Sequence, residues 1–474
     1  MSKPVKTILF VICGFITLLA LLKVGLLVVD TDANRTRLET AISKALGMGV
    51  RVGGGLGISL FPSLHINLED VHLAQRGDEV ASVEKVRLGI ELLPLLQNKI
   101  RIGTLALKHP RISIERHQDG TFNYEKKEPD GDTEVTLGWS KVSISEGTLI
   151  FSDHQSGAEF EASDCSLTIG QLRPSGWKIS NLLKNLSFTA ELACGVIRSH
   201  DLPMSAVNLS ASGKNGVIDL KPVTMQVFGA PGSGSFHADF SGAIPLYGLH
   251  YELSAFSIEK FFKILSPRQV VAGAMDFSAD LSAQGKTLNE IRPTIMGKVS
   301  LRGEDIKLLG RDLDQEFSQF ESSQNFNLVD VSAFFFAGPL GLLVTKGYNF
   351  ASNLQGPGGS SEISTLVSDW QVEHGVAQAQ DVALATGKHR VALQGGLDLV
   401  NEKFKDLTLA LIDAEGCAKV RQSIRGSFHD PQVEKPNLLK SLAGPVEKVL
   451  KMGRDLFPGG ECEPFYTGSV ASPE

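Results

Sequence analysis

The sequence predicts a mainly β protein, with an N-terminal transmembrane helix followed by an elongated, twisted antiparallel β-sheet groove and a few short amphipathic helices. Three observations predict this class. One long apolar segment opens the chain, and after it many short segments alternate apolar and polar residues. The third observation is compositional, since 48 glycines and only 7% aromatic residues favour many strand ends and turns over a compact aromatic core.

The apolar segment runs from Thr7 to Val29 and contains one charge, Lys23. As a helix it would be roughly 34 Å long, enough to cross a hydrocarbon core of about 30 Å. Because Lys3 and Lys6 precede it, the positive-inside rule leaves residues 1–6 in the cytoplasm and places the rest on the other side. A cleaved signal peptide is the alternative, but the segment is longer than a usual signal core and no small-x-small cleavage site follows.

A short amphipathic helix is expected next, in "DANRTRLETAISKALG", with Asp32 as N-cap and Gly47 as its end. Beyond it the apolar period becomes two, with one shift of register at Glu69-Asp70. The alternation predicts a sheet with one apolar face and one polar face. The residues expected on the apolar face are Leu64, Ile66, Leu68, Val86, Leu88, Ile90, Ile100, Ile102, Leu105, Leu107, Ile112 and Ile114.

The stretch "LALKHPRISIERHQDGTFNYE", residues 105–125, carries the densest set of reactive side chains. We interpret it as a strand bend followed by a hairpin turn. Pro110 should end strand pairing because it has no N–H to donate, and His109 before it should be extended. Asp119-Gly120 should then reverse the chain, with Asn123 bonding locally to hold the turn.

No catalytic, metal or cofactor site is predicted. Gly285-Lys286-Thr287 imitates the end of a phosphate-binding loop, but Asp280 stands where the first glycine is needed. The glycine-rich "RVGGGLGIS" lacks dinucleotide spacing, and the 11 histidines are scattered. The sequence has no G-x-S-x-G elbow and no H-E-x-x-H helix, so we expect no enzyme. A net charge of −7 without a long basic run makes nucleic acid an improbable partner.

Two features concern the C-terminal half. Cys165, Cys194, Cys417 and Cys462 allow two disulfides in three connectivities, one of which ties Cys462 to Cys417. The segment from Pro436 to about Leu456 has an amphipathic helical pattern, interrupted by Pro445. It suits either an anionic membrane surface or a cap over the open end of a sheet.

The order of motifs in residues 1–125 resembles the AsmA family. The anchor and short helix are followed by "GISLFPSLHINLEDVHL", by "LLPLL", by a strand ending at Pro110 and by the Asp119–Asn123 turn. A weaker resemblance covers residues 273–314 and the closing segments 389–411 and 424–434. These features divide the chain into a stub (1–6), an anchor (7–29), an AsmA-like N-terminal β region (30–165), a middle β region (166–272), an AsmA-like C-terminal β region (273–431) and a C-terminal helix and tail (432–474).

The resemblance implies a bacterial inner-membrane protein with most of its chain in the periplasm, related to bridge-like lipid transfer proteins. The expected ligand is a phospholipid or another acyl-chain lipid, held on the apolar face during transport between inner and outer membranes, with no cofactor. The alternative is an assembly factor that regulates targeting or insertion of outer-membrane proteins by adding their strands to its sheet edge. A closed, filled core on the apolar face would count against both functions.

Overall fold

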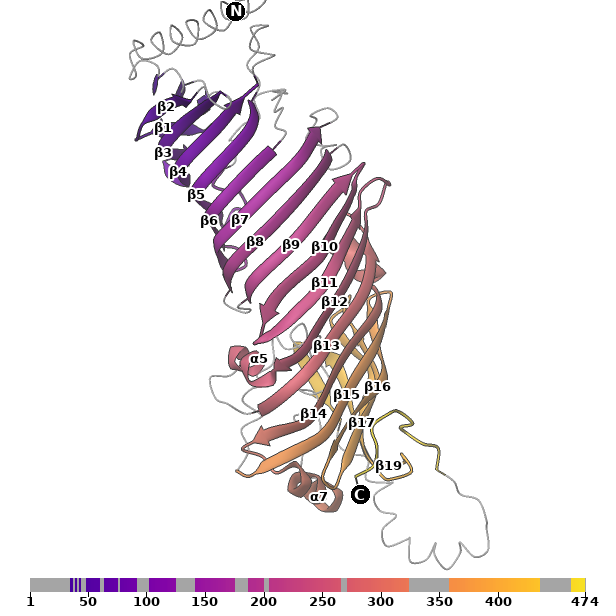
Figure 1. The fold of residues 1–474 in the computed structure, drawn as a ribbon. Coiled ribbons are helices and arrows are strands. Elements are labelled where there is room, and N and C mark those ends of the chain that lie inside the picture. Colours follow the sequence, from indigo (N-terminus) through magenta and orange to yellow (C-terminus); the bar gives the residue numbers. More distant parts are fainter. Residues whose placement is uncertain are drawn as a thin grey trace, which may run out of the picture. The chain divides into compact units, whose positions relative to one another are not determined.

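The structure is a computed structural model (Figure 1) that describes residues 35–36, 39–40, 42–43, 48–59, 64–75, 77–91, 102–124, 141–174, 186–199, 204–265, 271–323, 358–434 and 462–473. These ranges contain 20 strands and a few short helices, so the prediction of a mainly β protein is confirmed. Within them no helix is both long enough and apolar enough to cross a bilayer. The expected membrane helix, Thr7–Val29, and Ile100 lie outside these ranges.

The chain divides into two compact units, Met1–Thr168 and Ile169–Glu474. In the first unit β3, β4 and β5 form an antiparallel meander, and β1 and β2 both pair with β3. The bounds are β1 (Gly49–Val52), β2 (Leu56–Ser59), β3 (His65–Gln75), β4 (Asp78–Ile90), β5 (Ile102–Arg116), β6 (Lys141–Asp153) and β7 (Ala158–Pro174).

One pairing corrects the expectation of a purely antiparallel sheet. β5 and β6 run parallel, with Thr104 opposite Lys141 and Arg116 opposite Asp153. An antiparallel pair can be joined by a two-residue turn, whereas a parallel neighbour requires a long connection. Residues 117–140 supply that length between the two strands. The turn at Asp119-Gly120 is therefore not the tip of a hairpin between β5 and β6.

A crease crosses the first unit where the alternation of side chains shifts. Four residues along this line have a positive φ: Asp70 in β3 (55°), His109 in β5 (49°), Glu146 in β6 (54°) and Asp164 in β7 (53°). The pairing of β3 with β4 and of β4 with β5 keeps the same register across this point. Two successive side chains on each of these strands therefore face the polar side, and the apolar residues before and after them stay on one face. The change of alternation noticed at Glu69-Asp70 thus continues across neighbouring strands.

The β1 edge of this sheet is covered by side chains from the residues before it. Residues 35–36, 39–40 and 42–43 are helical, which agrees with the expected amphipathic helix where the structure describes it. The backbone N–H of Val50 donates to Ser43 Oγ (3.0 Å) and that of Val52 donates to Glu39 Oε1 (2.7 Å). An exposed edge would offer these N–H groups to another strand, so the two side chains protect this edge.

The second unit is an antiparallel meander from β8 to β20, in which each strand pairs with the next. Its elements are β8 (Leu186–Ser199), β9 (Met204–Lys214), β10 (Val217–Val227), β11 (Ala230–Asp239), β12 (Leu246–Ser257), α5 (Ile258–Leu265), β13 (Val271–Gln284), α6 (Leu288–Ile291), η2 (Arg292–Thr294), β14 (Met296–Leu309), α7 (Leu313–Ser323), β15 (Ser360–Glu373), β16 (Val376–Thr386), β17 (Arg390–Asp398), β18 (Lys403–Ile412), β19 (Ala418–Ser427) and β20 (Asp430–Val433).

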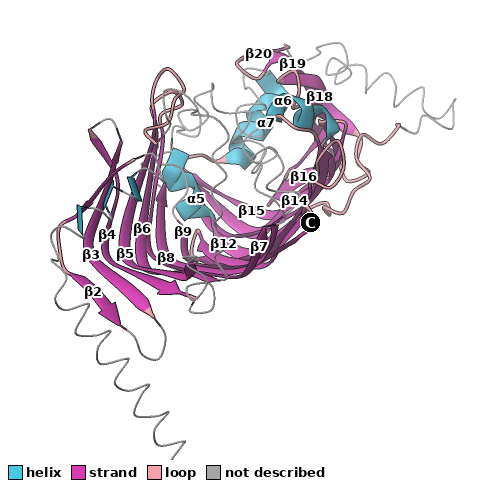
Figure 2. Cartoon of the chain, turned by 90° about the horizontal axis from the view of Figure 1, so that it is seen from above, coloured by secondary structure: helices cyan, strands magenta, loops and turns pink. Residues whose placement is uncertain are grey.

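The sheet of the second unit is curved, and α5 and α7 lie on its concave side (Figure 2). Phe262 of α5 and Phe317 of α7 are buried in one core cluster with apolar side chains of the strands, among them Trp370 and Leu409, so β13–β19 surround a filled core. On β15–β18 the opposite face is also buried, by the C-terminal residues Phe465, Tyr466 and Val470. Strands covered on both sides need apolar residues at successive positions. This explains runs such as "LTLALI" in β18.

Candidate functional site

The apolar face of the first unit is built by register. Residues that stand directly opposite in paired strands point to the same side of a sheet. Two rows lie on one side of the crease and two on the other, and together we call them the apolar face. The rows are Ile58, Ile66, Leu88, Leu105 and Val142; Leu56, Leu68, Val86, Leu107 and Ile144; Val52, Val71, Val83 and Pro110; and Val50, Leu73, Ala81, Ile112 and Leu149.

This register places the described candidates from the sequence on one face. Leu64 and Ile90 continue the first row, since the N–H of Ile90 donates to the carbonyl of Leu64 at 2.8 Å. Ile102 stands opposite Ile90 in the ladder, and Ile114 lies opposite Phe151 of β6.

Exposure differs along the apolar face. Leu68 and Val86 are 2% and 9% exposed and belong to a small core with Val50, Val52, Val71 and Val83. In the first row, Ile58 is 41% exposed, and Ile66, Leu88 and Leu105 are half-buried. Leu64, Ile90, Leu107, Ile112 and Ile114 are half-buried as well. The first unit therefore has a partly open apolar face, whereas β13–β19 of the second unit enclose a filled core.

The stretch 105–125 is structural, with two corrections. β5 continues through Pro110, which stands opposite Val83, so the proline does not end the strand. His109 is left-handed instead of extended, and it lies where the crease crosses β5. Its Nδ1 lies 2.6 Å from Glu84 Oε2, and its Nε2 contacts Glu146. The imidazole thus links three neighbouring strands on the polar face.

The Asp119–Asn123 turn is held as expected. Gly120 has φ +86°, which favours glycine, and Asp119 Oδ1 accepts from the N–H of Thr121 at 2.9 Å. Asn123 is buried, with 4% exposure; its Oδ1 accepts from the N–H of Glu115 (3.2 Å) and its Nδ2 donates to the carbonyl of Ser113 (2.9 Å). The amide therefore folds the turn back onto β5.

A pocket of about 540 Å³ lies on the polar face beside β1 and β3. Arg51, Asp70, His72 and Glu79 line it together with several glycines. His72 contacts Glu79 Oε1 and Asp70 Oδ1, each at 2.9 Å, and these hydrogen bonds, that of Glu79 first, raise the pKa of His72 above 6.5. The ionic groups satisfy one another, and the described residues contain no cluster of metal-ligating side chains.

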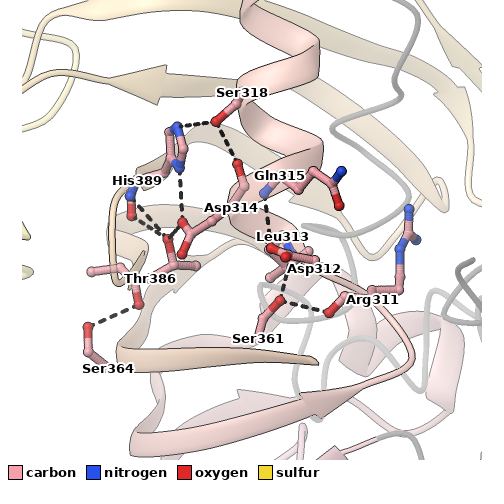
Figure 3. Close-up of polar contacts among 11 residues, drawn as sticks. Arg311, Asp312, Leu313, Asp314, Gln315, Ser318, Ser361, Ser364, Thr386 and His389 are labelled. Carbon is pink, nitrogen blue, oxygen red and sulfur yellow. Dashed lines mark hydrogen bonds and ion pairs between the residues drawn. The ribbon is translucent and has the colours of Figure 1, made fainter. Parts of the chain in front are cut away.

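A polar network at the start of α7 has the order of a catalytic triad (Figure 3). His389 Nδ1 lies 2.9 Å from Asp314 Oδ1, and His389 Nε2 lies 3.5 Å from Ser318 Oγ. However, Ser318 lies inside a helix and its hydroxyl donates to the carbonyl of Asp314 at 2.7 Å. Thr386 Oγ1 also donates to Asp314 Oδ1, at 2.5 Å. The geometry ties α7 to the β16–β17 turn and does not point the hydroxyl at a substrate.

The same helix is anchored at its N-terminus by groups that the sequence reading did not single out. Asp312 Oδ1 accepts from the N–H of Gln315 (3.0 Å), as an N-cap does, and Ser361 Oγ links the N–H of Leu313 to the carbonyl of Arg311. Arg311 and Glu316 form a buried ion pair with an Nη2–Oε2 distance of 2.7 Å. Asp312 three residues before Gln315 was the available sequence signal.

The Gly285-Lys286-Thr287 segment caps a short helix. Thr287 is the N-cap of α6, and its side chain accepts from the N–H of Glu290. Glu290 Oε2 accepts in turn from the N–H of Lys286 at 2.8 Å. This arrangement resembles a capping box, with the glutamate accepting from the residue before the N-cap, and it accounts for the motif without phosphate.

The disulfide that the sequence left open is present between Cys417 and Cys462. It joins the β18–β19 turn to the described C-terminal residues 462–473. The sequence segment 436–456, with its amphipathic pattern, lies outside the described residues.

Comparison with known proteins supports the resemblance seen in the motifs. The model of the AsmA family matches residues 1–188, which include the first unit and its apolar face. Neither the curated proteins nor the solved structures gave a match to this chain. The family match covers the motif order that runs from the N-terminal segment through the Asp119–Asn123 turn. Residues 1–188 of the chain therefore match the AsmA family, in agreement with the resemblance that the sequence motifs indicated.

Proposed function

We propose that this protein binds acyl-chain lipid on the apolar face of its first unit and supports phospholipid transport between the inner and outer membranes. The observation that carries the proposal is the first row of that face, in which Ile58, Ile66, Leu88 and Leu105 lie side by side and remain partly exposed. Contiguous apolar surface is costly to leave in water, and acyl chains can cover it.

The mechanism follows from the two faces of the sheet. Lipid tails would lie against the half-buried rows, while head groups stay in water at the open side. The polar face, with the His109–Glu84 and His72–Glu79 contacts, faces away from the tails. No bond is made or broken in this function, and no cofactor is required.

The alternative, assembly of outer-membrane proteins by strand addition, requires a free sheet edge. At the β1 edge the outward N–H groups of Val50 and Val52 are already bonded to Ser43 and Glu39. This observation favours lipid over an added strand at that edge.

The test uses the full chain extracted in mild detergent, with lipids identified by mass spectrometry. We expect phospholipid to copurify with the wild type and to be lost in Leu88→Asp, because a carboxylate on the apolar face repels the tails. The matched control is Arg87→Asp, which changes the neighbouring, exposed residue on the polar face. Equal lipid content in both variants would contradict the proposal, and binding of unfolded barrel peptides without lipid would favour the assembly function.

We also propose that Thr7–Val29 is a retained inner-membrane anchor, with the cytoplasmic stub before it and the rest of the chain in the periplasm. A retained helix of roughly 34 Å matches the bilayer, and the preceding lysines favour this orientation. The test is a C-terminal alkaline phosphatase fusion in a Gram-negative host, together with the mass of the membrane-bound protein. An inactive fusion would reverse the orientation, and a mature chain lacking the apolar segment would show a cleaved signal.

A further inference from the structure

The C-terminal residues Phe465–Val470 lie across the outer face of β15–β19, opposite the filled core. One row of outward positions there reads Val367, Ala383, Ala392 and Ala410 on four successive strands. Outward positions of a solvated sheet are usually polar, yet the three alanines are 0% exposed. Small side chains leave room for a covering segment, and Phe465, Tyr466 and Val470 occupy that room.

Polar contacts fix this segment at its far end. Asp381 of β16 accepts from Tyr466 Oη (2.5 Å), from the N–H of Ser469 (3.0 Å) and from Ser469 Oγ (2.6 Å). Arg390 of β17 donates to the carbonyl of Val470 at 2.8 Å. One carboxylate therefore gathers three donors from the segment, and an arginine on the adjacent strand holds the residue that follows.

The near end is held by the β18–β19 turn and by β19. The N–H groups of Phe465 and Tyr466 both donate to the carbonyl of Gly416, at 2.8 and 3.1 Å. The guanidinium of Arg421 lies 5.0 Å from the centre of the Phe465 ring. Next to these contacts the Cys417–Cys462 disulfide closes a sequence separation of 45 residues. Cys462 is exposed, so a thiol can reach it.

We propose that Phe465–Val470 form a strap that holds the curvature of β15–β19 and that reduction of the Cys417–Cys462 disulfide releases it. The strap touches β16, β17, the β18–β19 turn and β19, so it links strands that otherwise meet only their neighbours. The reductant is a dithiol, which passes two electrons and two protons to the disulfide; two cysteine thiols form and the dithiol becomes a disulfide. This device is independent of the proposed lipid binding.

Reduction should release the strap because it lowers the effective concentration of the strap at its docking site on the sheet. With the disulfide formed, Phe465 is three residues from a covalent anchor beside its own site. After reduction, the covalent connection of the segment to β20 runs through the 27 residues between Glu434 and Cys462, and its local concentration falls. Release would uncover the alanine row and loosen the strands beneath it.

Hydrogen–deuterium exchange on the full chain tests the strap. In the oxidised wild type we expect slow exchange at the amides of Tyr466, Ser469 and Val470, each of which donates a hydrogen bond. In Cys462→Ser, and in the wild type treated with dithiothreitol, we expect exchange about tenfold faster or more at these amides and faster exchange in β16–β18. Asp381→Asn should free the far end while the disulfide persists, and Ser472→Ala, outside these contacts, is the matched control.

Two outcomes would overturn the proposal. Unprotected strap amides in the oxidised protein would show that the segment is not docked. Unchanged protection after complete reduction, verified by thiol counting, would show that the disulfide does not control docking. Deletion of residues 463–474 provides a separate readout, because a strap that holds curvature must slow exchange in β16–β18, and equal exchange with and without it would exclude that role.

Discussion

At the scale of single residues, the most reactive stretch of the chain serves the geometry of the sheet. His109 lies on the crease with φ 49° and is flanked by Glu84 and Glu146 on the neighbouring strands. A left-handed conformation is costly for any residue with a Cβ, so surrounding contacts must hold it. The contacts of its imidazole with these two carboxylates supply part of that stabilisation.

Among the residues of the Asp119–Asn123 turn, we expect substitution of Asn123 to lower the free energy of unfolding most. In Asn123→Ala the N–H of Glu115 and the carbonyl of Ser113 lose buried partners, so we expect the first unit to lose about 2 kcal/mol of unfolding free energy. Urea denaturation of the full chain measures it, with exposed Gln118→Ala as the control. A loss no larger than that of the control would contradict the role of Asn123.

His72 should titrate above pH 6.5, because hydrogen bonds to Glu79 and then Asp70 stabilise its charged form. A raised folded-state pKa means that this contribution is present below the unfolded pKa and is lost as pH rises through the folded pKa. NMR titration of the imidazole measures the shift, and Glu79→Gln should move the pKa down. The contribution to stability is small since the side chain is 38% exposed. A pKa at or below 6.5 in the wild type would refute the expectation.

At the scale of elements, α7 illustrates how a helix with a modest apolar side is fixed by polar contacts at one end. Leu313 and Phe317 enter the core, while Asp314 receives hydrogen bonds from Thr386 and His389 of the β16–β17 turn. These contacts explain why a serine, a histidine and an aspartate meet although the serine hydroxyl is directed to the carbonyl of Asp314 and not to the histidine as a nucleophile would be.

A structural role and a catalytic role of Asp314, Ser318 and His389 predict different results. Asp314→Asn should weaken the second unit by about 1–3 kcal/mol, since hydrogen bonds to a charged group are lost. Ser318→Ala should change stability by less than about 0.5 kcal/mol, because the residue is exposed, its shorter hydrogen bond stays within its own helix and its contact with His389 is long, at 3.5 Å. Thermal unfolding of both variants checks this. Labelling of Ser318 by a fluorophosphonate would instead reveal an activated hydroxyl and contradict the structural interpretation.

At the scale of the whole molecule, the two units differ in how far their apolar faces are covered. β13–β19 cover theirs with α5 and α7, whereas the first row of the apolar face in the first unit stays partly exposed. A filled core leaves no apolar surface for lipid, so the proposal is limited to surfaces that remain open.

This contrast predicts where lipid can be captured. A photoreactive amino acid at Leu105, half-buried on the apolar face, should crosslink to copurifying phospholipid, whereas the same residue at Leu409, 0% exposed, should not. Arg111, exposed on the polar face of β5, serves as the control. Mass spectrometry of the crosslinked peptides gives the answer, and lipid on Arg111 as often as on Leu105 would place the lipid elsewhere.

The sequence by itself determined the mainly β class, the candidate residues of the apolar face and the resemblance of the N-terminal part to the AsmA family, because period-two alternation and short ordered motifs are local properties. The apolar pattern also indicated the crease, through the change in apolar alternation at Glu69-Asp70. Only the tertiary structure decided that β5 and β6 are parallel, that Pro110 lies within a continuous strand and that Cys417 pairs with Cys462. It also decided which apolar residues are covered. These facts depend on contacts between residues far apart in the chain, and local propensity carries no information about them.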